Sequence, residues 1–372
     1  MQTTFPRLLL KHASERPSAP AMREKEYGIW QTIHWAEMAQ MVEHMACGLH
    51  QAGLTRGEHL VVIGSNRPRL YATMLAAQSL GAIPIPLYQD AVAAECVFPL
   101  NNAEVRFAVV EDQEQVDKLL EIREQCPQIA HIFFDDPRGL RKYDEPGLAS
   151  LEELLAAGAV FAKQHPDFYL EEVEKAHTDD VGAMFFTSGT TGNPKGVVYH
   201  HRGAAINAVS NVLDWDMNKH PVYLWTLPMF HCNGWCFPWT IAARAGVNVC
   251  LRRVDAQHIF AAIKEHGVTH YCAAPIVHNL LVNAPDELKA GVPAGVKGLI
   301  AGAAPPASII EGMEKLGFDL THVYGLTEVY GPAAVCVKQD EWNDVDIGER
   351  ARLNARQGVR YHLQQAIDVL DP

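Results

Sequence analysis

The sequence contains no two cysteines spaced as Cys-x-x-Cys, although it has eight cysteines in all. Zinc ribbons and thioredoxin-like redox sites need such pairs, so neither kind of site is expected. The pairs His200–His201 and Cys232/Cys236 also lack the spacing of a closed four-ligand zinc site. Thiols spread in this way along a chain are typical of reduced, mostly buried cysteines in a cytosolic protein.

Positive charge is scarce as well. Lysine and arginine together number 31, against 44 aspartates and glutamates, which leaves a formal net charge of −13. A general nucleic-acid-binding protein usually carries a basic field, so we expect no nucleic-acid partner. The acidic balance does not exclude an anionic small molecule, because a local site can be positive within an acidic protein.

Long apolar runs are missing too. No stretch reaches the roughly 18 apolar residues that a transmembrane helix needs. The opening "MQTTFPRLLLKHASERP" carries an apolar run that is too short for a signal peptide. These absences predict a cytoplasmic protein without a transmembrane segment, and they leave its oligomeric state open.

The sequence does contain the pattern of an α/β protein. Its 372 residues are 48% hydrophobic, which is enough for two or three domains with sizeable cores. In the first half, short apolar runs alternate with helical spacing, which predicts a parallel sheet covered by helices on both faces. A short hairpin is expected around Tyr27-Gly28, and the polar stretch 150–180 is interpreted as a helical connection. The predicted strands are 59–66, 82–87, 105–112, 131–136, 222–231, 247–253, 268–275, 296–306 and 321–331.

The stretch "FFTSGTTGNPKG" at residues 185–196 has the chemistry of a polyphosphate clamp. Gly189, Gly192 and Gly196 allow positive-φ turns, so successive N–H groups can point inward as an anion nest. Hydroxyl groups and the ammonium of Lys195 add donors for phosphate oxygens. A flexible linker would lack the apolar, strand-like residues found on both sides. A Walker A loop needs Ser or Thr after its lysine, whereas Gly196 follows Lys195 here.

Residues 187–196, "TSGTTGNPKG", resemble the phosphate-loop signature of the adenylate-forming, AMP-binding superfamily. This superfamily includes acyl-CoA synthetases, luciferases and the adenylation domains of peptide synthetases. Three further segments resemble family motifs in the same order, and the resemblance extends over residues 5–372. The three segments are "LPMFHCNGW" (227–235), "GAAPP" (302–306) and "YGLTE" (324–328).

The resemblance implies the large N-terminal domain of the adenylate-forming fold. This is a layered α-β-α-β-α arrangement of two mainly parallel sheets with helices, followed by part of a distorted β-barrel. The implied boundaries are an N-terminal α/β subdomain at 1–175 and a second α/β subdomain at 176–340, which carries the ATP and acyl site. The start of the barrel would lie at 341–372.

The resemblance also implies a nucleotide site. The 187–195 loop would grip the β- and γ-phosphates of ATP, Thr327 would bind the α-phosphate, Glu328 would hold magnesium and Tyr324 would stack on adenine. Adenylation concentrates negative charge in its transition state, so positive dipoles and a metal ion are needed, and a carboxylate suits magnesium. The implied nucleotide-binding residues are Thr187, Ser188, Gly189, Thr190, Thr191, Gly192, Lys195, Gly302, Ala303, Ala304, Tyr324, Gly325 and Thr327.

An acyl pocket is implied beside this site, and its bulky lining predicts a short- or medium-chain acid. His231 would act as a gate between the carboxylate and the nucleotide. Together with Lys195, Thr327 and Glu328, it makes up the expected catalytic set. The implied substrate-binding residues are Phe230, His231, Trp235, Val329, Tyr330 and Gly331.

The family pattern continues beyond residue 372. It adds a ribose-binding aspartate, a hinge, and a small C-terminal domain whose lysine assists adenylation, and none of these occurs in this sequence. We therefore expect a chain without the small C-terminal domain, in which adenylation is weakened and transfer to CoA is absent.

The function that the resemblance implies is ATP-dependent activation of a fatty or other short- or medium-chain carboxylic acid. This is the first half-reaction of an acyl-CoA synthetase, with ATP and Mg²⁺ at the site and CoA as co-substrate in the intact family member. Two alternatives remain open. One is a catalytically inactive nucleotide- or acyl-binding fragment, and the other is an adenylation enzyme with an acceptor other than CoA.

Overall fold

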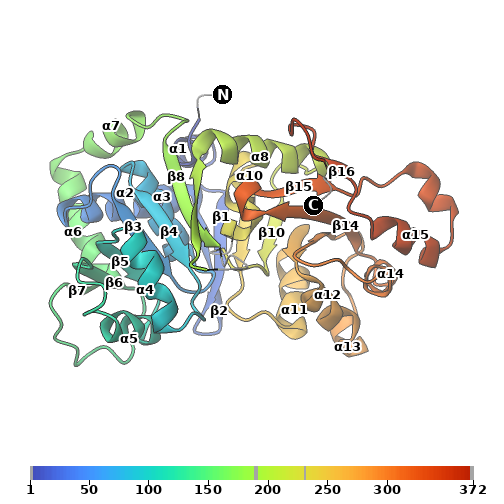
Figure 1. The fold of residues 1–372 in the computed structure, drawn as a ribbon, viewed down its shortest axis with the longest axis horizontal. Helices are drawn as coiled ribbons and strands as arrows, with labels where there is room; N and C mark the ends of the chain where they lie inside the picture. Colours follow the sequence, from blue (N-terminus) through green and yellow to red (C-terminus); the bar gives the residue numbers. More distant parts are fainter. Residues whose placement is uncertain (1–2, 188–191, 230–231, 369–372) are drawn as a thin grey trace. The chain divides into compact units, whose positions relative to one another are not determined.

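The computed structural model describes residues 3–187, 192–229 and 232–368. The chain forms two compact α/β units, and neither is continuous in sequence (Figure 1). The N-terminal unit comprises Met1–Ala21, Thr32–Ala204 and Met229–Asn233. The C-terminal unit comprises Met22–Gln31, Ala205–Pro228 and Gly234–Pro372. Residues 176–204, which the sequence analysis assigned to the second subdomain, therefore pack with the first.

The N-terminal unit is built on a five-stranded parallel sheet with the strand order β4-β3-β5-β6-β7. The chain enters the sheet at β3, adds β4 on one side, and then returns to add β5 on the other side. The predicted alternation of strands and helices is thus confirmed. The strands are β3 (His59–Ile63), β4 (Ile83–Leu87), β5 (Phe107–Val110), β6 (His131–Phe134) and β7 (Leu148–Ser150).

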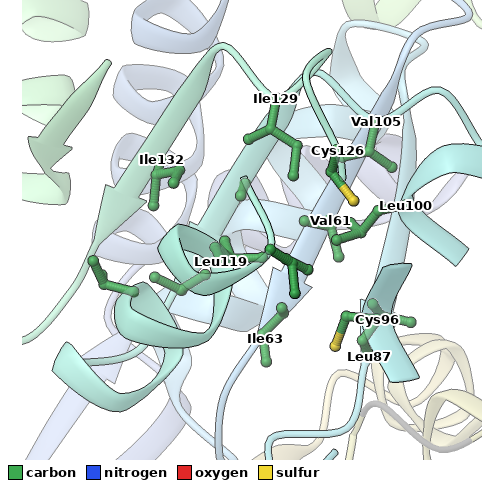
Figure 2. Packing of buried hydrophobic residues seen from close by; sticks show 14 of the residues in the cluster. Val61, Ile63, Leu87, Cys96, Leu100, Val105, Leu119, Cys126, Ile129 and Ile132 are labelled. Atoms are coloured by element: carbon green, nitrogen blue, oxygen red, sulfur yellow. The ribbon is translucent and has the colours of Figure 1, made fainter. Parts of the chain in front are cut away.

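One face of this sheet is covered by α4 (Ala93–Asn102) and α5 (Gln113–Glu121). Figure 2 shows Val61 and Ile63 of β3 pointing toward Leu119 of α5 and Leu100 of α4. Because side chains alternate along a strand, the intervening residues of β3 point to the opposite face. Burying each such aliphatic side chain contributes roughly 2 kcal/mol. The helices that pack together around α2 and α3 are α1 (Phe5–Glu15), α2 (Trp35–Gln51), α3 (Pro68–Ser79), α6 (Leu151–Gln164) and α7 (Phe168–Glu174).

An antiparallel hairpin of β8 (Val181–Thr187) and β9 (Lys195–His200) belongs to the same unit. The Gln78 side chain of α3 donates a 2.6 Å hydrogen bond to the Gly182 carbonyl. Met184 and Phe186 pack against the core cluster that contains Val61. These contacts explain why the hairpin stays with the N-terminal unit.

The C-terminal unit contains a nine-stranded sheet with the order β16-β15-β14-β13-β12-β10-β11-β1-β2. The central strands from β1 to β14 are parallel, whereas β15 and β16 pair antiparallel at one end. Tyr27 and Gly28 both have positive φ, as a tight hairpin turn requires, so the hairpin predicted there is confirmed. The strands are β1 (Pro20–Glu26), β2 (Ile29–His34), β10 (Val222–Trp225), β11 (Val247–Cys250), β12 (His270–Ala273), β13 (Lys297–Ile300), β14 (Asp319–Leu326), β15 (Gly331–Val335) and β16 (Val359–Arg360).

Helices cover this second sheet through two separate sets of contacts. Ile263 and Phe260 of α11 and Met313 of α14 share an apolar cluster with Leu224 and Tyr271 of the sheet. A different residue of β10, Tyr223, stacks on Phe237 of α10 with ring centroids 5.1 Å apart. The remaining elements are α8 (His201–Asp214), α9 (Cys232–Trp235), α10 (Phe237–Ala243), α11 (Ala256–His266), α12 (Pro275–Val282), α13 (Asp286–Lys289), α14 (Ala307–Lys315), η1 (Thr327–Val329), η2 (Asp340–Asp344) and α15 (Ile347–Asn354).

The region 341–372, where the start of a barrel is expected, contains little strand in its described part. Residues 361–368 form no strand, and the last ladder is the two-residue β16, which pairs with β15. The backbone leaves the sheet at His362, where both the amide and the imidazole bind the carboxylate of Asp214. No helix in the part of the chain that the structure describes combines the length and the apolar character needed to cross a membrane.

Helices α2 and α6 approach each other so closely that their backbones touch. A Cβ on Gly158 of α6 would lie 1.7 Å from the His44 carbonyl oxygen of α2. A Cβ on Gly48 of α2 would lie 2.4 Å from the Leu154 carbonyl oxygen. Glycine is therefore required at both positions by space, not by backbone conformation.

We expect Gly158→Ala to destabilise the protein by about 2 kcal/mol, because the added methyl group forces two helix backbones apart. The measurement is the midpoint of thermal unfolding. Ala157 is exposed on the same helix, and Ala157→Leu should change stability by less than about 0.5 kcal/mol. Replacing glycine by alanine in an open helix normally stabilises it by about 1 kcal/mol, so a stabilised Gly158→Ala variant would contradict the close contact.

Candidate functional site

The β8–β9 hairpin presents the predicted phosphate loop. Thr187, the last residue of β8, pairs directly with Lys195, the first residue of β9, so the loop closes between them. The Lys195 side chain is exposed. Gly192 has φ 92°, and a Cβ there would meet no atom within 4 Å, so its backbone conformation is what favours glycine. Ser188, Gly189, Thr190 and Thr191 lie outside the described residues.

The predicted adenine-binding residues stand together at one edge of the C-terminal sheet. Strands β13 and β14 run parallel, with Ile300 paired to His322, so the loop after β13 lies beside the end of β14. That loop holds Gly302, Ala303 and Ala304, all of them exposed. Tyr324 on β14 is 41% exposed although it is a large aromatic residue. An exposed ring next to a wall of small side chains is suited to stacking on a flat base.

The turn that follows β14 holds the predicted phosphate and magnesium ligands. Thr327 and Glu328 form η1, in which Thr327 is buried and Glu328 is exposed. Within the described residues, the Glu328 side chain makes no hydrogen bond or ion pair. Those residues also contain no cluster of three side chains able to hold a metal. A lone exposed carboxylate fits magnesium, which binds through one or two carboxylates together with substrate phosphates.

Two segments predicted to line the acyl pocket meet within the C-terminal unit. A Cβ on Gly331 would lie 2.8 Å from the Trp235 carbonyl oxygen, so the two backbones are in direct contact. Trp235 is buried, Tyr330 is half-buried, and Val329 is 36% exposed. Phe230 and the predicted gate His231 lie outside the described residues.

Both of these segments contain left-handed backbone conformations. Trp235 and Cys236 have φ 59° and 67°, and Tyr330 has φ 70°. Left-handed conformations of bulky residues cost roughly 1–3 kcal/mol each and often mark functional sites. Gly234 precedes this turn with φ 54°, and a Cβ there would lie 2.2 Å from the ring of Trp225.

Asn66 is a further candidate site residue, which the sequence analysis did not identify. It lies in the loop after β3, the strand that has β4 on one side and β5 on the other. Its buried side-chain oxygen accepts a 2.9 Å hydrogen bond from the Met229 amide, immediately before Phe230. The available signal was the small polar loop "GSNRP" after a buried strand, because open α/β sheets bind ligands at such switch points.

The Asn66 loop rests on buried charges. The Ser65 amide donates a 2.6 Å hydrogen bond to a Glu111 carboxylate oxygen. Arg69 donates to Asp135, at 3.1 Å. Burial raises the pKa of the Asp135 carboxyl, while Arg67 and Arg69 oppose this rise. Breaking such a buried pair leaves an uncompensated charge, so the loop is held firmly in place.

The phosphate hairpin belongs to the N-terminal unit, whereas Tyr324, Thr327, Glu328 and Trp235 belong to the C-terminal unit. Within the C-terminal unit, the structure brings together the predicted adenine residues. It also brings Trp235 and Gly331 into backbone contact. The predicted roles of all these residues remain proposals.

Known proteins resemble this chain in sequence over most of its length. Acetate–CoA ligase CCL3 of Humulus lupulus is 37% identical over 350 residues, covering 91% of this chain and 60% of that protein. Acetate/butyrate–CoA ligase AAE7, peroxisomal, of Arabidopsis thaliana is also 37% identical, over 351 residues, with the same coverage of 91% and 60%. 2-Methylpropanoate–CoA ligase CCL4 of Humulus lupulus is 38% identical over 349 residues, with 91% and 60% covered. The chain thus spans about 60% of the length of these relatives.

Solved structures share the fold at lower sequence identity. The anthranilate CoA ligase AuaEII in complex with anthranoyl-AMP matches with a TM-score of 0.81 and 16% identity, over 97% of this chain and 65% of that chain. The N-terminal domain of FACL13 from Mycobacterium tuberculosis matches with a TM-score of 0.73 and 21% identity, over 93% of this chain and 81% of that chain. The family model described as AMP-binding enzyme matches residues 9–372. The chain therefore belongs to the AMP-binding enzyme family.

Proposed function

We propose that this chain binds ATP and activates a short-chain aliphatic carboxylic acid as its acyl adenylate. The observation that carries the proposal is the 187–196 hairpin, which places an exposed Lys195 opposite Thr187 at the mouth of a loop rich in glycine and hydroxyl groups. Family membership supports the reaction class. The names of three relatives refer to acetate, butyrate and 2-methylpropanoate, which supports a short aliphatic acid.

In the proposed reaction, a carboxylate oxygen of the acid attacks the α-phosphorus of ATP. The bond from this phosphorus to the oxygen that bridges to the β-phosphorus breaks, and pyrophosphate leaves with the electron pair. No proton needs to move. The leaving group gains negative charge, so Lys195 and the backbone N–H groups of the loop would act mainly by stabilising that charge.

The other nucleotide contacts would be those that the family resemblance implies. Tyr324 would stack on adenine beside Gly302–Ala304, and the Thr327 hydroxyl would bind the α-phosphate. Glu328 would hold Mg²⁺, which when bound supplies positive charge to the phosphates. The single exposed carboxylate fits this role, as described above.

The CoA ligase relatives support CoA as the acceptor in the intact family member, where its thiol would attack the acyl carbonyl and release AMP. One alternative function is adenylation with an acceptor other than CoA. A second alternative is a catalytically inactive chain that only binds a nucleotide or an acyl group. A cytoplasmic location also remains a prediction, since the Arabidopsis relative is named as peroxisomal.

We expect Lys195→Ala to weaken ATP binding by roughly 10- to 100-fold, the loss of one hydrogen bond to a charged group. AMP binding should be unchanged, because AMP lacks the β- and γ-phosphates. Isothermal titration of the purified 372-residue chain with each nucleotide measures both affinities. Lys163→Ala, at an exposed lysine of α6, is the matched control and should bind ATP like the unaltered chain. An equal loss for AMP and ATP would disprove the assigned role of Lys195.

We expect the chain to exchange labelled pyrophosphate into ATP only when Mg²⁺ and a carboxylic acid are both present. Acetate, butyrate and 2-methylpropanoate should support faster exchange than octanoate or cinnamate. Glu328→Gln should lower the exchange rate at least about tenfold and shift its magnesium dependence to higher concentrations, because one hard oxygen ligand loses its charge. Nucleotide binding without any acid-dependent exchange would instead favour the alternative of a nucleotide-binding chain.

A further inference from the structure

Buried polar side chains connect the two segments that the proposed function assigns to the acyl pocket. Asn207 and Asn211 lie four residues apart on α8, so their side chains share one face of the helix. The Asn207 amide donates a 2.9 Å hydrogen bond to the Pro332 carbonyl. The Asn211 amide donates to the Asn207 side-chain oxygen at 3.1 Å and to the Thr240 hydroxyl at 3.0 Å.

Each end of this chain of hydrogen bonds adjoins an acyl-pocket residue. Pro332 directly follows Gly331. At the other end, the Thr240 hydroxyl donates to the Cys236 carbonyl at 3.1 Å, and Cys236 directly follows Trp235. The bond from Thr240 to Cys236 alone is common for a helical threonine. The bond from Asn211 is what ties this turn of α10 to α8, and through Asn207 to β15.

The segments tied in this way are the strained ones in contact. Gly331 touches the Trp235 backbone, and Trp235 and Cys236 both have left-handed backbone conformations. Such conformations persist only where the surroundings determine them strongly. The indole of Trp225 closes the other side of the turn and is itself fixed by a 2.9 Å hydrogen bond to Asn248.

Apolar side chains at these positions would stabilise the fold better than this network of polar side chains does. Asn211 and Thr240 are fully buried, and Asn207 is 5% exposed. Among the described residues, no donor reaches the side-chain oxygen of Asn211. A buried polar network that is only partly satisfied is less stable than a well-packed apolar core. The network is therefore better explained by the positions in which it holds the neighbouring residues than by a contribution to stability.

We propose that Asn207, Asn211 and Thr240 are positioning residues that set the separation between Trp235 and Gly331, and thereby select the length of the acyl chain. This inference rests on the proposed function, because it assumes that these two residues line the acyl pocket. Without the network, the turn at Trp235 relaxes away from Gly331. The pocket then holds a short acyl group less tightly and admits a longer one.

The test compares AMP with stable acyl-adenylate mimics, the 5′-O-(N-acylsulfamoyl)adenosines that carry acetyl, butanoyl, hexanoyl and octanoyl groups. Titration calorimetry of the 372-residue chain gives the gain in affinity of each mimic over AMP. For Asn207→Leu, we expect AMP affinity within about twofold of the unaltered chain. The affinity gain of the acetyl and butanoyl mimics over AMP should fall about tenfold, which corresponds to one lost hydrogen bond. The mimic with the largest gain should then carry a longer acyl chain.

Thr240 provides a test in which the shape of the side chain is kept. Thr240→Val replaces the hydroxyl with a methyl group of similar size and should reproduce the loss of short-acyl affinity. Thr240→Ser keeps the hydroxyl and should retain short-acyl affinity. This pair carries the test if Asn207→Leu does not fold. Ser210→Ala is the matched control, because Ser210 is a buried polar residue of α8 outside the network.

The two hypotheses fail in different ways. If Thr240→Val lowers the thermal unfolding midpoint but leaves both the acyl gain and the chain-length preference unchanged, the network is structural only and this inference is wrong. If the unaltered chain binds no mimic better than AMP, the proposed function fails, and this inference fails with it.

Discussion

The parallel pairing of β13 with β14 is the constraint on which the proposed nucleotide-binding edge depends. Parallel strands all end at the same edge of a sheet, so their following loops are brought side by side even though long crossovers separate them in sequence. Here the register of Ile300 with His322 places the small residues Gly302–Ala304 next to Tyr324. The bulge at Tyr324 and Gly325 and the antiparallel return of β15 then bring Gly331 back beside the same edge.

Much of this fold follows from local sequence. Helix α2 is predictable because Trp35, Met38, Val42, Met45 and Leu49 repeat at helical spacing and are all buried. Helix α4 is less visible, because Pro99 lies inside it and a valine precedes it where a polar capping residue would be expected. Strand β7 has only three residues, all half-buried, which is too short for its period to be seen.

In the candidate site too, some features follow from local sequence and others do not. Its glycine, hydroxyl and acidic motifs are contiguous in sequence, so their chemistry can be recognised without a structure. Two hydrogen bonds join residues that are far apart in the chain, Asn66 with Met229 and Asn207 with Pro332. No local sequence pattern predicts them. The same holds for residues 181–200, which are assigned to the N-terminal unit by packing on its core, not by any change in composition.

The hairpin at residues 20–34 has a consequence for how the chain is made. Met22 of β1 takes its place in the C-terminal sheet beside Asn248 of β11, so an early strand stays without its partner until much of the chain has been synthesised. Pairings between distant residues form slowly, and an unpaired strand edge favours aggregation in the meantime. Cutting the chain between residues 204 and 205 would leave the second piece without β1 and β2 and the first without residues 229–233. The two units are thus interleaved, and neither corresponds to a contiguous segment that could be produced alone.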